Sequence, residues 1–224
     1  MQGVSGFGVV PIFLKWQYLD MRFIAFDLET TGTFAGIDRI VEIGMVRFEN
    51  GKPVDKFACL VDPQIPIPVA ASRVNGISND MVKGKPLIEE LLEPVTRYCQ
   101  NDVLVAHNAN FDFQFLLADF KRHSVQAPTG LIFDTLPLSR KVYPGLMSYK
   151  LATVAKHLNV STDVLHRADD DAKYCGLIFQ NILERLYHGS EPDWTDLIQV
   201  SGRPEMRFPI IEKQHKQLDL FAGL

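Results

Sequence analysis

Cysteine is scarce in this 224-residue chain, which has only Cys59, Cys99 and Cys175. An odd number of cysteines without a Cys-x-x-Cys pair argues against a disulfide framework, a zinc ribbon and a thiol redox site. Excess positive charge is also missing, since the formal net charge is −4 and the pI about 5.9. The chain therefore has no broad basic surface for long duplexes, and any hold on nucleic acid must be local.

Long apolar runs and a basic leader are missing too. The first twenty residues contain an apolar patch, but it is interrupted and no positively charged segment precedes it. We therefore expect neither a signal peptide nor a membrane span, and we expect a cytoplasmic protein. Residues 1–20 are interpreted as an N-terminal extension, either an alternative-start segment or a packed arm. The remainder is long enough for one main domain with a short appendage.

Strands and helices follow one another along most of the chain. Three strands are expected first, because short apolar or alternating runs are separated by turn signals. The expected strands are 23–28, 39–48, 53–61, 103–107 and 131–134, and the expected helices are 86–101, 111–123, a segment from Thr135, 148–160 and 168–187. This order predicts an α/β domain with a mixed central sheet flanked by helices. After Gly189 the pattern loosens, and residues 189–209 are interpreted as a linker.

Two acids stand two residues apart on the first expected strand. Asp27 and Glu29 point to the same side of the sheet because side chains alternate along a strand. Hard oxygen ligands this close suit Mg²⁺ or Mn²⁺, whose charge relieves their repulsion. Solvent-facing acids at a strand end explain the pair equally well. The turn Thr30-Thr31-Gly32 indicates either close approach of a substrate or an ordinary exit from the strand.

Two later segments add acids near expected helix starts. Asp112 follows an apolar strand and therefore belongs to the sheet edge where open α/β sheets collect ligand-binding groups. Considered alone, Asp112 is more simply a first-turn acid that complements the helix dipole. His166 precedes Asp171 by five residues, and this pairing suits a general base beside a metal ligand.

Three segments together resemble a known family. FDLETTG, HNANFDFQFL and HRADDDA match, in order and spacing, the motifs of the DEDDh 3′–5′ exonucleases. This DnaQ-like group includes bacterial polymerase proofreading subunits. VNGISNDMV and SYKLATVA also resemble its linking regions, so the resemblance covers about residues 22–186. It implies a ribonuclease-H-like fold, with an exonuclease domain over residues 21–188.

The resemblance assigns a role to five residues. It implies that Asp27, Glu29, Asp112 and Asp171 bind two Mg²⁺ or Mn²⁺ ions and that His166 is the general base. In such enzymes one ion prepares the attacking water and the other stabilises the leaving 3′ oxygen, so a nucleoside 5′-monophosphate is released. Contacts with the terminal nucleotide are expected from Leu28, Thr30, Thr31, Gly32, Asn108 and Phe113.

Basic side chains gather near the last expected helices. Arg140, Lys141, Lys150 and Lys156 are candidates for contact with phosphates of the substrate strand. A solvated helical face explains them equally well. Among the other histidines, only His107 in the second motif is expected to help shape the site.

A short motif stands close to the C-terminus. Gln217, Leu218, Asp219, Leu220 and Phe221 resemble the pentapeptide by which bacterial proteins bind the polymerase sliding clamp. In that resemblance the glutamine forms hydrogen bonds, and the last two residues fill an apolar pocket. Short motifs also match by chance, and the alternative is an amphipathic end that folds back onto its own domain. We interpret residues 189–224 as a linker and a C-terminal clamp-binding tail.

These observations predict a metal-dependent 3′–5′ exonuclease that acts on nucleic acid 3′ ends in replication proofreading or repair. DNA is favoured over RNA because of the tail, since the three motifs alone do not distinguish the two sugars. An exoribonuclease is the first alternative. An inactive adaptor for the clamp or for a DNA polymerase subunit is the second, although all five catalytic positions carry the required residue types.

Overall fold

One mixed sheet forms the centre of the molecule. The computed structural model describes residues 21–160 and 167–212. Its strands are β1 (Arg22–Thr30), β2 (Ile40–Glu49), β3 (Lys52–Leu60), β4 (Val103–Ala106) and β5 (Ile132–Asp134). They are ordered β3-β2-β1-β4-β5. Because β1 pairs antiparallel with β2 and parallel with β4, the predicted mixed sheet is confirmed.

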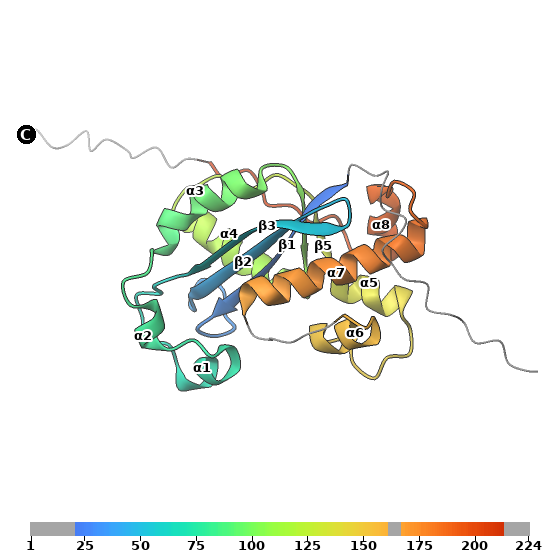
Figure 1. Cartoon of the computed structure of the whole chain (residues 1–224). Coiled ribbons are helices and arrows are strands. Elements are labelled where there is room, and N and C mark those ends of the chain that lie inside the picture. Colours follow the sequence, from blue (N-terminus) through green and yellow to red (C-terminus); the bar gives the residue numbers. More distant parts are fainter. Residues whose placement is uncertain (1–20, 161–166, 213–224) are drawn as a thin grey trace, which may run out of the picture.

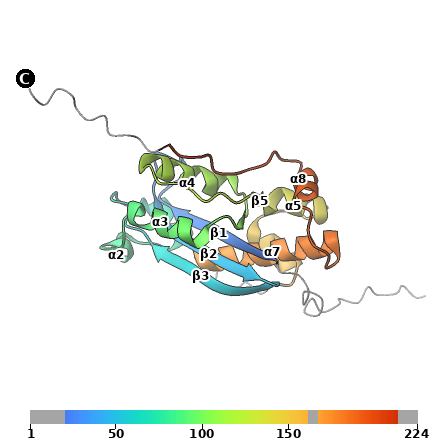
Figure 2. The same ribbon diagram turned by 90° about the horizontal axis from the view of Figure 1, so that it is seen from above.

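Helices cover both faces of this sheet. They are α1 (Val69–Asn75), α2 (Asn79–Val82), α3 (Ile88–Cys99), α4 (Asn110–Arg122), α5 (Thr135–Val142), α6 (Leu151–His157), α7 (Ala168–Tyr187) and α8 (Trp194–Ser201). Figures 1 and 2 show α3 and α4 on one face, whereas α7 crosses the other face with α5 and α6 beside it. None of the helices within the described ranges has the length and apolar character needed to cross a membrane.

The alternation of β1 decides which way its acids point. Phe23 and Ala25 belong to the apolar cluster beneath α7, and the ring of Phe23 meets that of Phe179 on α7 edge to face at 5.1 Å. The intervening residues pack on the opposite face, against α3 and α4. Since side chains alternate along a strand, Asp27 and Glu29 continue the row that faces α7.

The structure differs from the linker expected after residue 188. α8 is capped by Asp193, whose side chain accepts the backbone N–H groups of Thr195 and Asp196, and Leu197 on this helix is fully buried. Farther on, Met206 pairs with Ile132 of β5, and Phe208 is buried in the cluster on the α4 side. The folded domain therefore extends beyond residue 188 and includes the segment up to Phe208. Residues 1–20 and the motif at 217–221 lie outside the described residues.

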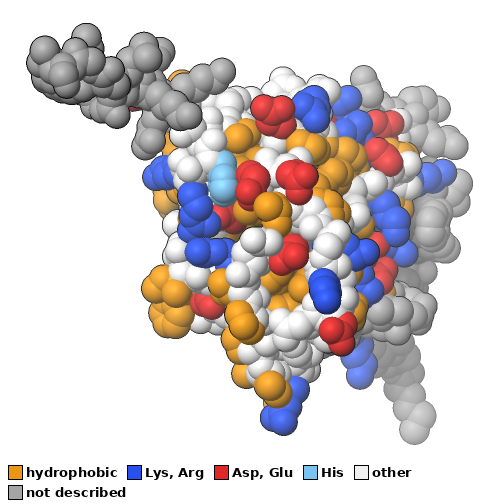
Figure 3. All heavy atoms as spheres, turned by 90° about the vertical axis from the view of Figure 1, so that its left-hand side faces the viewer, with side chains coloured by type: hydrophobic (Ala, Val, Ile, Leu, Met, Phe, Trp, Pro, Cys, Tyr) orange, Lys and Arg blue, Asp and Glu red, His pale blue; other side chains and the backbone are white. Residues whose placement is uncertain are grey.

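Surface charge is mixed where it can be seen. On the face that carries α1, α2 and α3, Figure 3 shows basic side chains lying next to acidic ones, with apolar side chains along the lower edge. This arrangement agrees with the formal net charge of −4 and provides no extended basic field on that face.

Candidate active site

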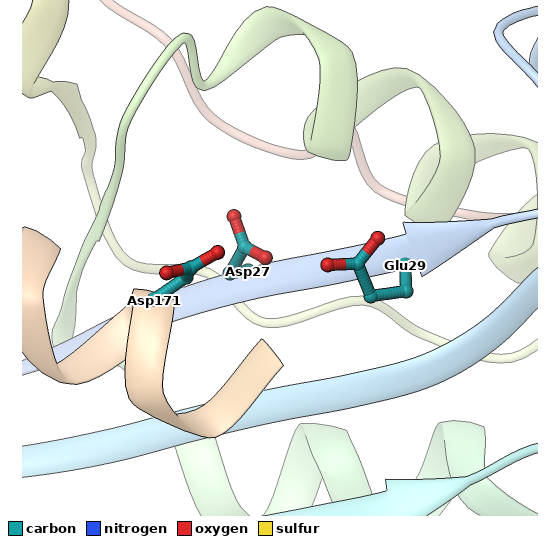
Figure 4. A group of neighbouring side chains, drawn as sticks. All are labelled: Asp27, Glu29 and Asp171. Atoms are coloured by element: carbon teal, nitrogen blue, oxygen red, sulfur yellow. The ribbon is translucent and has the colours of Figure 1, made fainter. Parts of the chain in front are cut away.

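Three carboxylates meet beside the centre of the sheet. Asp27 and Glu29 come from β1, and Asp171 comes from the first turn of α7. One carboxylate oxygen of each lies within 4.8 Å of the other two. Figure 4 shows the three side chains turned toward one another between the strand and the helix. The fold thus adds a third acid to the pair that the strand alternation predicts.

Asp112 lies against the same strand from the other direction. It is in the first turn of α4, it is buried, and its Oδ1 accepts the backbone N–H of Leu28 at 3.0 Å. Leu28 is the residue between Asp27 and Glu29, so this hydrogen bond fixes Asp112 next to both. Asp112 is not a member of the group within 4.8 Å. It is nevertheless a titratable neighbour of that group, because its charge, when present, raises the pKa of Asp27.

The acids interact strongly with one another. Burial raises the pKa of Asp27 well above its usual range, and the charges of Asp112 and Asp171 raise it further. Burial, followed by the charge of Asp171, raises the pKa of Glu29 to about 7. Burial also raises the pKa of Asp112 to about 8. Without a cation, ionising all of these groups at neutral pH is therefore unfavourable.

The donor set fits a hard divalent cation. Carboxylate oxygens are the preferred protein ligands of Mg²⁺ and Mn²⁺. Ligands on opposite sides of one Mg²⁺ lie about 4.2 Å apart, twice the usual metal–oxygen distance. The span of 4.8 Å among the three acids is close to this value. Small side-chain adjustments would bring them to a shared ion, whose charge would also relieve their mutual repulsion.

Glu42 anchors the start of α7 to the sheet. It lies on β2 directly opposite Glu29 in the strand register, and it is only 1% exposed. Its carboxylate accepts hydrogen bonds from Nε of Arg167, at 3.1 and 3.2 Å, and from the backbone N–H of Ala168 at 3.1 Å. Like charges opposite each other destabilise a sheet, and the guanidinium offsets this repulsion. These contacts set the position of the helix that carries Asp171.

Gly44 on β2 allows the start of α7 to pack directly against the sheet. It pairs with Asp27 in the strand register, and a Cβ at this position would lie 2.0 Å from the backbone carbonyl carbon of Ala168. A second contact comes from β3, where Lys56 donates to Asp169 at 2.8 Å. The first turn of α7 is therefore fixed by two neighbouring strands.

The turn after β1 is stabilised by its own side chains. The hydroxyl of Thr30 donates to the carbonyl of Gly32 at 2.6 Å, and that of Thr31 donates to Asp38 at 3.2 Å. A Cβ at Gly32 would lie 2.4 Å from the carboxylate of Asp38. Both hydroxyls that were expected to face a substrate are thus engaged within the turn. The glycine is explained by Asp38 without any substrate.

The other expected substrate contacts differ in exposure. Leu28 is buried in the apolar cluster on the α3 and α4 side, and the ring of Phe113 stacks on Phe208 with centroids 4.9 Å apart. Asn108 is exposed, has a left-handed φ of 67°, and donates its N–H to Asp134 at 2.9 Å. Among these three side chains, the one of Asn108 is the most accessible. His166 lies outside the described residues.

Two more residues, neither of them among the predicted site residues, lie next to the acids. Glu42 carries a signal that could have been used, because it is a charge in an otherwise apolar, fully buried stretch of β2. Asn75 at the end of α1 is buried, accepts the N–H of Ile77 at 3.0 Å and donates to the carbonyl of Thr30 at 3.3 Å. Its hydrogen bond to Glu29 lowers the pKa of that acid, against the larger effect of burial.

Sequence comparisons agree with this geometry. Residues 24–179 match the RNase_T family, described as Exonuclease. DNA polymerase III subunit epsilon of Treponema pallidum is 36% identical over 189 residues, which cover 80% of this chain and 88% of that protein. DNA polymerase III PolC-type of Caldanaerobacter subterraneus subsp. tengcongensis is 44% identical over 168 residues, or 75% of this chain. The match spans only 12% of the length of that longer protein.

A solved structure shares the fold. Exonuclease X in complex with 5′ overhanging duplex DNA is similar with a TM-score of 0.62 and 27% sequence identity. The similarity covers 81% of this chain and 99% of that one. It confirms the expected ribonuclease-H-like class, a mixed sheet flanked by helices. The chain belongs to the RNase_T exonuclease family and is homologous to the epsilon subunit and to the exonuclease region of PolC-type DNA polymerase III.

Proposed function

We propose that this protein is a metal-dependent 3′–5′ exonuclease that removes nucleoside 5′-monophosphates from DNA 3′ ends, in replication proofreading or repair. The observation that carries the proposal is the convergence of Asp27, Glu29 and Asp171 within 4.8 Å in a chain of an exonuclease family. Members of this family depend on divalent metal ions. Asp112, hydrogen-bonded beside the same strand, completes the proposed set of metal-binding acids.

The chemistry follows from these positions. Two Mg²⁺ or Mn²⁺ ions held by the four acids would activate a water and stabilise charge on the phosphate and on the leaving 3′ oxygen. His166 accepts the proton of the attacking water, a task that suits a side chain titrating near neutrality. Glu42 holds the start of α7, so that Asp171 stays in place throughout the reaction. Asn75, hydrogen-bonded to Glu29, orients that carboxylate.

The terminal nucleotide is proposed to lie along the turn formed by Thr30, Thr31 and Gly32. Because both threonine hydroxyls are engaged within the turn, this surface would meet the nucleotide mainly through its backbone and methyl groups. Asn108 is proposed as a further contact because it is exposed at the start of the segment that leads to Asp112. Leu28 and Phe113 would contribute through packing, since both belong to the apolar interior.

DNA is proposed as the substrate. The two relatives are DNA polymerase III proteins, and the similar solved structure is a DNA complex. An exoribonuclease is the alternative. We also propose that residues 217–221, from Gln217 to Phe221, dock onto a bacterial sliding clamp, and that the setting is the cytoplasm. Residues 1–20 are proposed to be an extension outside the exonuclease domain.

The test is digestion of 5′-labelled single-stranded DNA and RNA of the same sequence, with Mg²⁺, with Mn²⁺ and with EDTA. We expect a metal-dependent ladder that shortens from the 3′ end of DNA, lost in Asp27→Asn. The matched control is Asp55→Asn, which changes an exposed acid on β3 and should leave the ladder intact. Preference for RNA would favour the exoribonuclease. No cleavage of either strand by folded, metal-supplied protein would overturn the proposal in favour of an inactive adaptor.

A further inference from the structure

A groove of about 610 Å³ runs along α5 and the segment before α6. Its lining includes Asn108, four residues before Asp112 in the segment between β4 and α4. The walls include Arg140 on α5, and Met147 and Lys150 in the segment that leads to α6. The groove is therefore lined in part by the segment of chain that leads to Asp112, one of the four acids.

The charged side chains of this groove are cationic. Arg140 and Lys150 are both exposed, and no aspartate or glutamate is among the described residues that line it. The guanidinium of Arg140 lies 5.9 Å from the ring centroid of Tyr149, so an aromatic surface adjoins a positive charge. Met147 is fully exposed at the rim. The groove is thus positively charged, although the chain has a formal net charge of −4.

A neighbouring cavity has a different character. It holds about 400 Å³ between α5 and α8, and it shares Asn108 and Arg140 with the groove. Its lining, however, includes the acids Asp134 and Glu205 beside the bases Arg140 and Arg203, so its charges balance. Carboxylates repel phosphates, so a nucleic acid strand is better matched by the groove on the α6 side.

Hydrogen bonds fix the part of the groove wall around Tyr149. The ring of His107 at the end of β4 lies 2.7 Å from the carbonyl oxygen of Tyr149 through Nε2 and 2.8 Å from the hydroxyl of Thr135 through Nδ1. Burial lowers the pKa of His107, so the ring is neutral at neutral pH. The Nε2–H then donates to the carbonyl, and Nδ1 accepts the threonine hydroxyl. The Tyr149 hydroxyl also donates to the carbonyl of Tyr143 at 2.8 Å.

We propose that this groove binds the substrate strand on the 5′ side of the scissile phosphodiester. Arg140 and Lys150 contact its phosphates, while Tyr149 and Met147 lie against its sugars and bases. Cations that position phosphates beside exposed aromatic and apolar side chains are the usual means of holding a single strand without sequence preference. Because hydrogen bonds already fix the part of the wall around Tyr149, only the exposed side chains such as Arg140 and Lys150 need to be ordered when a strand binds. This inference rests on the proposed function.

The proposal separates the four basic residues that the sequence singles out. Arg140 and Lys150 line the groove, whereas Lys141 and Lys156 do not. Lys141 is exposed on the same helix as Arg140, with the same charge and the next position in the chain. Lys141→Gln is therefore a matched control for the double variant Arg140→Gln with Lys150→Gln.

The experiment compares kcat/KM on oligothymidylates of increasing length with kcat/KM on the p-nitrophenyl ester of thymidine 5′-monophosphate, which has no upstream strand. For the wild type, we expect the ratio of kcat/KM on the oligothymidylate to kcat/KM on the minimal substrate to rise with the length of the oligothymidylate. The double variant should lower this ratio about tenfold or more through KM, and Lys141→Gln should not. Each lost phosphate contact should also reduce the salt dependence of binding by about 0.7 in log–log slope.

The groove proposal would be refuted if kcat/KM of the wild type did not depend on substrate length. It would also be refuted if the double variant and Lys141→Gln had the same kcat/KM at every length and salt concentration. If the wild type hydrolyses neither substrate, the proposed function fails instead. Fluorescence anisotropy of a labelled oligothymidylate then still tests the groove. A dissociation constant about tenfold larger in the double variant alone would support the groove proposal. Equal dissociation constants in all three proteins would refute it.

Discussion

The contact between Gly44 and the start of α7 allows the assembly of the site to be tested quantitatively. A Cβ at position 44 would lie 2.0 Å from the carbonyl carbon of Ala168, whereas ordinary van der Waals contact begins at 3.4 Å. Gly44→Ala must therefore push the first turn of α7, with Asp171, away from β2 by about 1.4 Å. Since a misplacement of about 1 Å can cost about 10²-fold in rate, we expect kcat to fall about 100-fold.

A glycine of α7 itself, Gly176, provides the control. A Cβ at Gly176 would lie 2.1 Å from the ring of Phe48, in the apolar cluster away from the acids. Overpacking of this kind costs about 1–3 kcal/mol, so both variants should lose comparable stability in thermal unfolding. Only Gly44→Ala should lose turnover on oligothymidylate with Mn²⁺. Full kcat in a folded Gly44→Ala protein, or equal loss in both variants, would refute the reasoning.

Three further predictions concern pH, the anchor of α7 and the tail. The pKa of Glu29 is about 7 in the folded chain against an ordinary 4.5, so between these pH values the folded state binds more protons than the unfolded state. In EDTA the free energy of unfolding should then fall by roughly 3 kcal/mol as pH rises through this window. Saturating Mn²⁺ should reverse this fall. Melting temperatures that do not change from pH 5 to 8 would contradict the prediction. Glu42→Gln removes the charge paired with Arg167 and should raise the Mn²⁺ concentration needed for half-maximal activity several-fold. An unchanged Mn²⁺ requirement would show that the charge of Glu42 is not needed to position α7. Leu220→Ala with Phe221→Ala should weaken binding to an immobilised bacterial sliding clamp at least tenfold in surface plasmon resonance, and equal affinity would exclude docking by the tail.

The local part of the site could be read from the sequence. Asp27 and Glu29 are two residues apart on a strand, so their side chains point to the same face of the sheet. In the structure this is the face covered by α7. The contributions of Asp112 and Asp171 are contacts between distant parts of the chain. Periodicity cannot predict such contacts. The position of Asp112 after a strand indicated only that it lies at the sheet edge, and the family resemblance was needed to assign both residues to the site on β1.

Other features depended on contacts that spacing does not encode. Glu42 lies opposite Glu29 only because of the register between β1 and β2. Gly32 was expected to admit a substrate, but the carboxylate of Asp38 occupies the space beside it. α8 was missed because a helix of eight residues gives little more than two turns of periodicity. The burial of Phe208 depends on apolar residues of α4 far from it in the sequence.

The most direct test of the account is the release of labelled mononucleotide from 3′-end-labelled single-stranded DNA by the wild type, Asp171→Asn and Asp170→Asn, with Mn²⁺ and with EDTA. The two variants change adjacent acids in the first turn of α7, of which only Asp171 belongs to the carboxylate cluster. We predict release of the terminal nucleotide as a 5′-monophosphate by the wild type and Asp170→Asn with Mn²⁺, and at least about 100-fold slower release by Asp171→Asn. Equal release by all three proteins, or release that persists in EDTA, would contradict the assignment of the acidic cluster as the metal-dependent catalytic centre.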